Sequence, residues 1–241
     1  MGEKHYWREA MIFLNIIVEG SSEEAFVKGV LKDHFVQNGV YVTARKILTG
    51  WDKSANRPAK GGMLKYSKFR NDVFRWIESD RGRADTYYTS MVDLYAFPVD
   101  NNSPYNARIR GIHDPFLRVE ALEDAIASDI GHPTFIPYVQ LHEFEALVLT
   151  DPERLLVLYP GKEKAIARLK NEIAGKHPEE INENPRTAPS KRIIKHIPEY
   201  DGQKAQAGPL VVEDIGLNKL REHCAHFNQW ITKLEGLTIS D

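Results

Sequence analysis

The chain has 241 residues, a formal charge of −2 at pH 7 and a hydrophobic content of 42%. This composition supports a packed core and excludes disorder of the whole chain, while the near-neutral charge gives no global basic field for nucleic acid and leaves room only for a local patch. The single cysteine, Cys224, excludes an internal disulfide and any zinc site built from several cysteines. The polar start and the short apolar run from Met11 to Val18 give neither a signal peptide nor a membrane span. We therefore expect a soluble cytoplasmic protein without membrane contact.

Apolar runs alternate with amphipathic stretches along the first 140 residues. Met11 to Val18 is almost continuously apolar, which is typical of a strand covered on both faces. A helix is predicted from Ser21 to about Gln37, with a capping box of Ser21 and Glu24 at its start and Asn38-Gly39 at its end. The same criteria predict strands over Val40 to Leu48, Thr86 to Val92 and Thr134 to Val139, helices over Tyr66 to Ile77 and from Asp114-Pro115 to Ile126, and loops over Thr49 to Met63 and Pro98 to His113.

This order of elements predicts an α/β fold with a largely parallel, four-stranded sheet flanked by helices. Pro137, inside the fourth strand, indicates an edge position or a bulge. After residue 150 the pattern is helical and loop-like, and it closes with an amphipathic helix from Phe227 to Leu237. We expect an α/β domain over residues 1–150 and a helical extension over residues 151–241 that packs on it.

Two of the predicted strands end in a carboxylate. Val18 is followed by Glu19 and Gly20, and Val92 is followed by Asp93. Ligands bind at the carboxyl edge of an open α/β sheet, and neighbouring strands would bring Glu19 and Asp93 together there. Converging carboxylates repel one another, so they usually hold a hard cation such as Mg²⁺. Gly20 permits a tight turn and the close approach of a phosphate.

Two residues beside these carboxylates have two interpretations each. Glu23, in the first turn of the following helix, is a candidate metal ligand or base, but an acid there also stabilises the helix dipole by roughly 0.3–1 kcal/mol. Tyr95, two residues after Asp93, could stack on a base or donate to a phosphate, or it could pack at the edge of the sheet. The sequence leaves both questions open.

A short helix is predicted from His142 to Leu149, directly after the fourth strand and therefore near the same edge. His142 and Glu145 are three residues apart, a spacing that can share a metal on a helix. Glu143 lies on the other flank and is our candidate for the third acidic ligand. The alternative is an ordinary solvated helix start.

Lys191 and Arg192 stand in the first turn of a helix that begins at Pro189. Cations at this place oppose the helix dipole, so an anion should compensate them. A phosphate would serve, as would an ion pair with one of three acids nearby in the sequence, Glu179, Glu180 or Glu183.

The segment Val18-Glu19-Gly20-Ser21-Ser22-Glu23 resembles the glutamate motif of Toprim domains. Together with Met91 to Tyr95, Gln140 to Leu147 and Thr187 to Ile193, it makes the chain resemble, nearly end to end, the uncharacterised DUF4276 family, which is classed as Toprim-like. The resemblance implies Mg²⁺-dependent cleavage of DNA or RNA, because Toprim proteins include topoisomerases, primases and nucleases. Toprim-like nucleases often act beside ATPases in antiphage defence.

One part of the Toprim pattern is missing. A full site has Asp-x-Asp after the third strand, whereas this chain has Asp93-Leu94-Tyr95, and Asp100 is too far along to replace the second aspartate without a rearranged loop. Either another carboxylate supplies that ligand or the metal site is weakened.

Two hypotheses follow. The first is a nuclease or phosphodiesterase that acts on nucleic acid with Mg²⁺ (or Mn²⁺), in antiphage defence with an ATPase partner. Its metal ligands would be Glu19, Asp93 and Glu143, its catalytic residues Glu19, Glu23 and Asp93, and its substrate contacts Gly20, Tyr95, His142, Glu145, Lys191 and Arg192. The second is a non-catalytic Toprim-like module that binds or regulates an ATPase, and the missing aspartate favours it.

Overall fold

A parallel sheet forms the centre of the protein in a computed structural model, which describes residues 11–47, 51–52, 57–58, 63, 65–95, 97–181 and 186–237. The strand order is β2-β1-β5-β6, and β7 also pairs with β5. The strands are β1 (Ile12–Val18), β2 (Val40–Lys46), β5 (Thr86–Asp93), β6 (Phe135–Ile136) and β7 (Val139–Gln140), and all of their pairings are parallel. The prediction of an α/β fold with a parallel sheet is confirmed.

The predicted fourth strand is split in two. Tyr88 pairs with Phe135 of β6 and Val92 with Val139 of β7, so both pieces lie on the same side of β5. The backbone of Tyr138, which follows Pro137, does not pair with β5. It bonds instead to the Ser90 hydroxyl, which donates to the Tyr138 carbonyl at 3.0 Å and accepts from the Tyr138 N–H at 3.0 Å. The interruption that Pro137 indicated is therefore real, and it lies at the edge of the sheet.

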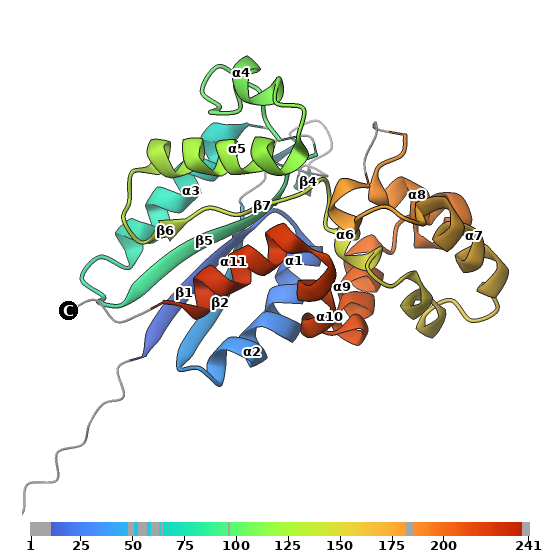
Figure 1. The fold of residues 1–241 in the computed structure, drawn as a ribbon. Helices are drawn as coiled ribbons and strands as arrows, with labels where there is room; N and C mark the ends of the chain where they lie inside the picture. Colours follow the sequence, from blue (N-terminus) through green and yellow to red (C-terminus); the bar gives the residue numbers. More distant parts are fainter. Residues whose placement is uncertain are drawn as a thin grey trace, which may run out of the picture.

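Helices cover both faces of the sheet (Figure 1). One face packs against a continuous helical stretch made of α1 (Ser21–Phe26), a π-helical segment (Val27–Leu31) and α2 (Lys32–Val36), and against α11 (Ala225–Glu235). The other face packs against α3 (Tyr66–Ser79) and α5 (Pro115–Ile130). Side chains of β1 alternate accordingly, since Leu14, Ile16 and Val18 belong to the first core and Ile17 to the second.

The helical extension lies beside one end of the sheet and then returns to it (Figure 1). It contains α6 (Glu145–Val148), α7 (Glu163–Ile173), α8 (Pro189–His196), α9 (Lys204–Ile215), α10 (Leu217–His223) and the 3₁₀ turns Pro152–Val157, Pro178–Glu180 and Pro198–Tyr200. The ring of Trp230 on α11 stacks on Tyr138 at 4.2 Å, and its Nε1 donates to the Thr89 hydroxyl at 2.9 Å. Extension and sheet thus share one core, and a boundary at residue 150 stays a prediction.

Three predicted segments differ from the structure. The predicted loop Pro98 to His113 contains a short helix, α4 (Ala107–Arg110), which the Asn106 side chain caps by accepting from the Ile109 N–H. The predicted loop Thr49 to Met63, most of which lies outside the described residues, contains the antiparallel pair β3 (Trp51–Asp52) and β4 (Arg57–Pro58). The predicted helix His142 to Leu149 is helical only from Glu145 to Val148. None of the described helices combines the length and apolar character that crossing a membrane requires.

Candidate functional site

The carboxyl ends of β1 and β5 bring Glu19 and Asp93 together. Val18 pairs with Met91, and the Glu19 N–H donates to the Met91 carbonyl at 3.2 Å. The Glu19 side chain then reaches across the two strands, because its Oε2 accepts from the Asp93 N–H at 3.0 Å and its Oε1 from the Met63 N–H at 3.1 Å. The two carboxylates converge on one edge of the sheet, which is the arrangement that the strand ends predicted.

The N-cap of helix α1 lies one residue earlier than predicted, and Glu23 at position N3 closes the turn. Gly20 is the N-cap, and its N–H donates to Glu23 Oε2 at 2.8 Å, so the predicted capping box of Ser21 and Glu24 is wrong. Glu24 instead forms ion pairs with Lys28 at 2.7 Å and Lys46 at 2.9 Å, outside the site. A Cβ on Gly20 would lie 3.0 Å from Glu23 Oε2, so glycine permits this close turn.

Five carboxylates form what we call the carboxylate cluster: Glu19, Glu23, Asp93, Glu143 and Glu145. Burial raises the pKa of Asp93 well above its usual range, and the charges of Glu23, Glu19, Glu145 and Glu143 raise it further. Burial also raises the pKa values of Glu23 and Glu145 to about 7 each, with neighbouring carboxylates adding to the effect. Asp93 Oδ1 is buried and has no hydrogen-bond partner among the described residues. The cluster therefore holds more negative charge than its surroundings neutralise.

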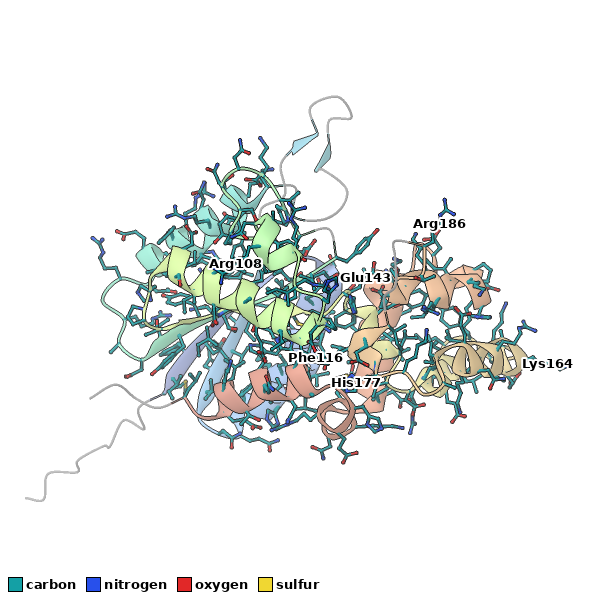
Figure 2. All side chains as sticks on the ribbon, turned by 45° about the horizontal axis from the view of Figure 1, so that its top comes forward. Arg108, Phe116, Glu143, Lys164, His177 and Arg186 are labelled. Carbon is teal, nitrogen blue, oxygen red and sulfur yellow. The ribbon has the colours of Figure 1, made fainter. Side chains whose placement is uncertain are left out.

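The segment between β7 and α6 brings Glu143 and Glu145 to the cluster, but it is not the helix that the sequence predicted. His142 has a φ of +66°, a left-handed conformation that a helix excludes. The predicted sharing of one helix face by His142 and Glu145 is therefore wrong. Glu143 Oε2 accepts from the Ser190 N–H at 3.0 Å, and Glu145 Oε1 accepts from the Tyr200 hydroxyl at 3.4 Å. Figure 2 shows Glu143 where the sheet meets the extension.

The side chain of His142 interacts with Arg118 and with the backbone of Glu179. Burial lowers its pKa to about 4, and the charge of Arg118 lowers it further, against a hydrogen bond to the Glu179 backbone. Its Nε2 is buried without a hydrogen-bond partner among the described residues. Tyr95 is nearby through its backbone, since its N–H donates to the His142 carbonyl at 2.8 Å. The structure gives neither side chain a contact with the cluster.

Helix α8 begins at Pro189 as predicted, but its two cations differ. The buried Arg192 donates from Nε to the Thr187 carbonyl and from Nη1 to Glu172 Oε1, both at 2.8 Å. Lys191 is exposed and makes no hydrogen bond or ion pair with any described residue. Of the acids that the sequence suggested, Glu183 lies outside the described residues, and Glu179 caps α11 by accepting from the N–H groups of its first turn.

The donor set of the cluster fits a hard divalent cation in chemistry and charge, because it consists of carboxylate oxygens and includes one buried oxygen without a partner. It is not a preformed cage, since no group of three or more His, Cys, Asp or Glu side chains in the described part of the chain is arranged to hold a metal. Backbone N–H groups occupy oxygens of Glu19, Glu23 and Glu143. Each of these oxygens keeps a second lone pair for a metal, so the hydrogen bonds hold the carboxylates in place without excluding coordination.

Asp100 does not supply the missing second aspartate. Its Oδ2 accepts from the Tyr66 N–H at 3.0 Å and its Oδ1 from the Asn102 N–H at 3.1 Å, so it fixes the start of α3. Three residues that touch side chains of the cluster, Met63, Ser190 and Tyr200, were not among the predicted site residues. Ser190 adjoins the predicted Lys191, whereas nothing around Tyr200 in the sequence signals its contact.

A comparison with known protein families identifies the family of the chain. The family model described as "Domain of unknown function (DUF4276)" matches residues 18–235. The chain belongs to the DUF4276 family. No curated protein matches the chain at a significant level. This DUF4276 chain is similar to two structures of the C-terminal region of the OLD protein from Xanthomonas campestris pv. campestris.

The first of these structures, phased with mercury, shares 12% identity with a TM-score of 0.36, and the match covers 92% of this chain and 97% of that one. The second, phased with iodine, shares 16% identity with a TM-score of 0.33, and the match covers 92% and 96%. At these values no residue role is carried over from them.

Proposed function

We propose that this DUF4276 protein is a divalent-metal-dependent phosphodiesterase that hydrolyses nucleic acid, with Mg²⁺ or Mn²⁺ as its cofactor. The observation that carries the proposal is the environment of Asp93. Its buried Oδ1 has no partner among the described residues, and four carboxylates raise its pKa in addition to the effect of burial. Like charges at such a place are stabilised by a cation or by protonation.

Each carboxylate has a proposed role. Glu19, Asp93 and Glu143 would hold the cation, which, when bound, polarises a phosphoryl oxygen and lowers the pKa of an attacking water. Glu23, with a pKa of about 7, is suited to take a proton from that water near neutral pH. Gly20 keeps the turn beside Glu23 free of a side chain, so a phosphate can approach the backbone.

The substrate contacts and the biological setting belong to the same proposal. Lys191, exposed beside the cluster, would contact a phosphate, and Glu145, Tyr95 and His142 would line the approach. Arg192 would act indirectly by fixing the start of α8 through Thr187. An ATPase partner and antiphage defence are supported by the resemblance of Val18 to Glu23 to the Toprim glutamate motif. A cytoplasmic location is supported by the single cysteine, which suits a reducing compartment.

The direct test is cleavage of labelled single- and double-stranded DNA and RNA with Mg²⁺ or Mn²⁺, compared with EDTA. Glu19→Gln should reduce cleavage at least about 100-fold, since removing one interaction with the transition-state charge costs roughly 10²–10³-fold. Glu24→Gln is the matched control, because Glu24 lies nearby on α1 and pairs with Lys28 and Lys46 outside the cluster, and it should cut at the wild-type rate. Undiminished cutting by a folded Glu19→Gln protein would contradict the scheme.

A non-catalytic module that binds an ATPase or nucleic acid is the second candidate. Two observations favour it. The described residues contain no group of three or more side chains arranged to hold a metal ion. Tyr95 also stands where the Toprim pattern Asp-x-Asp has its second aspartate. The wild-type protein would then bind no Mn²⁺ and cut none of the four substrates. Metal-dependent cutting that Glu19→Gln abolishes would eliminate this candidate.

A further inference from the structure

A pocket with the opposite charge is lined by α8, the helix whose Ser190 contacts the carboxylate cluster. It has a volume of 470 Å³ and is lined by four cationic side chains, Arg186, Lys191, Arg192 and Lys195, and by one carboxylate, Glu172. The pocket belongs to the extension, between α7 and α8 (Figure 2, where Arg186 is labelled). Its excess of positive charge suits an anionic ligand.

Glu172, the single carboxylate of this pocket, already interacts with three basic side chains. Glu172 Oε1 accepts from Arg192 Nη1 at 2.8 Å, and its Oε2 lies 2.8 Å from Lys195 Nζ and 2.8 Å from His196 Nε2. Arg186 and Arg192 make further interactions, so Lys191 is the lining cation that stays without a partner among the described residues.

Helix α8 connects the pocket with the cluster directly. The Ser190 N–H donates to Glu143 Oε2 at 3.0 Å, and the next residue, Lys191, lines the pocket. The Ser190 hydroxyl is buried and has no hydrogen-bond partner among the described residues. Lys191 and Lys195 are four residues apart on one helical face, and Lys195 lies about 7.5 Å along the axis from Ser190. That is the axial rise of roughly two nucleotides in a strand.

We propose that the α8 pocket binds the phosphodiester backbone of a nucleic-acid strand and leads that strand to the carboxylate cluster. The inference rests on the proposed function and deepens it by assigning the path of the substrate. Exposed lysines bind backbone phosphates without reading sequence, which a strand passing towards a cleavage site requires.

The test is the binding of labelled single-stranded DNA and RNA of equal length, measured by fluorescence anisotropy in EDTA over a range of salt concentrations. The variant is Lys191→Gln with Lys195→Gln, which leaves Arg192 and His196 on Glu172. We expect affinity to fall about tenfold or more near 50 mM salt, and the slope of log K against log salt to shrink by about 0.7 per lysine. The control is Lys164→Gln, an exposed lysine at the far end of α7 (Figure 2).

The control should bind within about twofold of wild type, and DNA and RNA should lose affinity alike, because the backbone phosphate is common to both. Unchanged affinity and salt slope in the double variant, or an equal loss in Lys164→Gln, would overturn the assignment. Mn²⁺ binding separates it from the proposed function. Loss of strand binding with full Mn²⁺ binding supports the pocket, and so does lysine-dependent strand binding in a wild-type protein that binds no Mn²⁺ and cuts nothing.

Discussion

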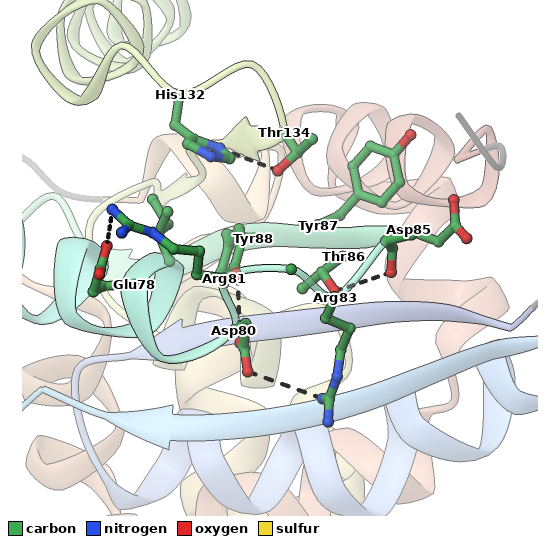
Figure 3. A pocket seen from close by; sticks show the side chains of 13 residues that line it. Glu78, Asp80, Arg81, Arg83, Asp85, Thr86, Tyr87, Tyr88, His132 and Thr134 are labelled. Atoms are coloured by element: carbon green, nitrogen blue, oxygen red, sulfur yellow. Dashed lines mark hydrogen bonds and ion pairs between the residues drawn. The ribbon is translucent and has the colours of Figure 1, made fainter. Parts of the chain in front are cut away.

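The two edges of the sheet differ in how far their charged side chains are paired. At the amino edge, a cavity of 590 Å³ is lined by acidic and basic side chains that pair with one another (Figure 3). Arg81 lies 2.8 Å from Glu78, and Asp80 accepts from the Tyr88 hydroxyl at 3.3 Å with Arg83 at 3.9 Å. At the carboxyl edge, the carboxylate cluster crowds five acids around a buried oxygen that has no partner among the described residues.

This difference shows that a well-formed cavity is not by itself evidence of a functional site. The charged side chains around the amino-edge cavity pair with one another, so they leave little charge for a ligand. The carboxyl edge has strongly raised pKa values, which mark sites where chemistry or ion binding changes the charge. Left-handed backbone at a residue other than glycine occurs at both edges, at Asp85 and at His142, so strain of this kind does not distinguish them.

Removing one carboxylate from each edge should test the difference between the edges most clearly. Asp93→Asn should abolish cleavage and at the same time stabilise the metal-free protein at pH 8 by about 1–3 kcal/mol, because it removes a buried charge that its neighbours repel. Asp80→Asn should leave cleavage unchanged and destabilise by about 1 kcal/mol, because Asp80 loses charge-assisted contacts to Arg83 and Tyr88. Urea unfolding in EDTA gives both stabilities. Destabilisation by Asp93→Asn would contradict the unbalanced charge.

The pH dependence of stability should separate the cluster from the α8 pocket. The pKa values of Glu23 and Glu145 rise to about 7 on folding, so the folded protein binds more protons between pH 4.5 and 7. Stability is therefore highest below about pH 4.5 for these groups and falls as the pH rises through 7. Glu23 alone would lower the free energy of unfolding by about 3 kcal/mol over this range, at about 1.4 kcal/mol per pKa unit. The contribution of Glu145 does not simply add to this value, because the two carboxyl groups interact as they titrate.

Glu172 in the α8 pocket should act with the opposite sign. Burial opposes ionisation, but Lys195 and His196 outweigh it and lower the pKa of Glu172 to about 2. Its contribution is present above pH 4.5 and is lost as the pH falls towards 2. Urea unfolding of wild type and of Glu23→Gln in EDTA, at intervals from pH 4.5 to 8, isolates the effect of the cluster. A wild-type stability that rises steadily over this range would contradict the raised pKa values.

The sequence predicted the parts of the site that depend on local pattern. An apolar run that ends in Glu19-Gly20, and another that ends in Asp93, identify strand ends, and parallel neighbours must bring such ends together. Pro137 likewise indicated the break in the edge strand. These features need only the periodicity of strands and the chemistry of single residues.

Tertiary contacts decided the rest. His142 is not glycine, so its left-handed conformation has no signal in the sequence and follows from how β7 is joined to the extension. The contacts of Ser190 with Glu143 and of Tyr200 with Glu145 join residues 47 and 55 positions apart. The capping of α1 by Gly20 was missed because a glycine N-cap leaves no side-chain signature, whereas Ser21 and Glu24 match the usual one.

Titration of Mn²⁺ into the metal-free protein at pH 8, followed by calorimetry, tests the central claim most directly. The account predicts saturable binding of at least one ion per chain to the wild-type protein, and loss of that binding in Asp93→Asn, with Asp80→Asn unchanged. No binding to the wild type, or equal binding to Asp93→Asn, would contradict the claim that the carboxylate cluster is a site for a divalent cation.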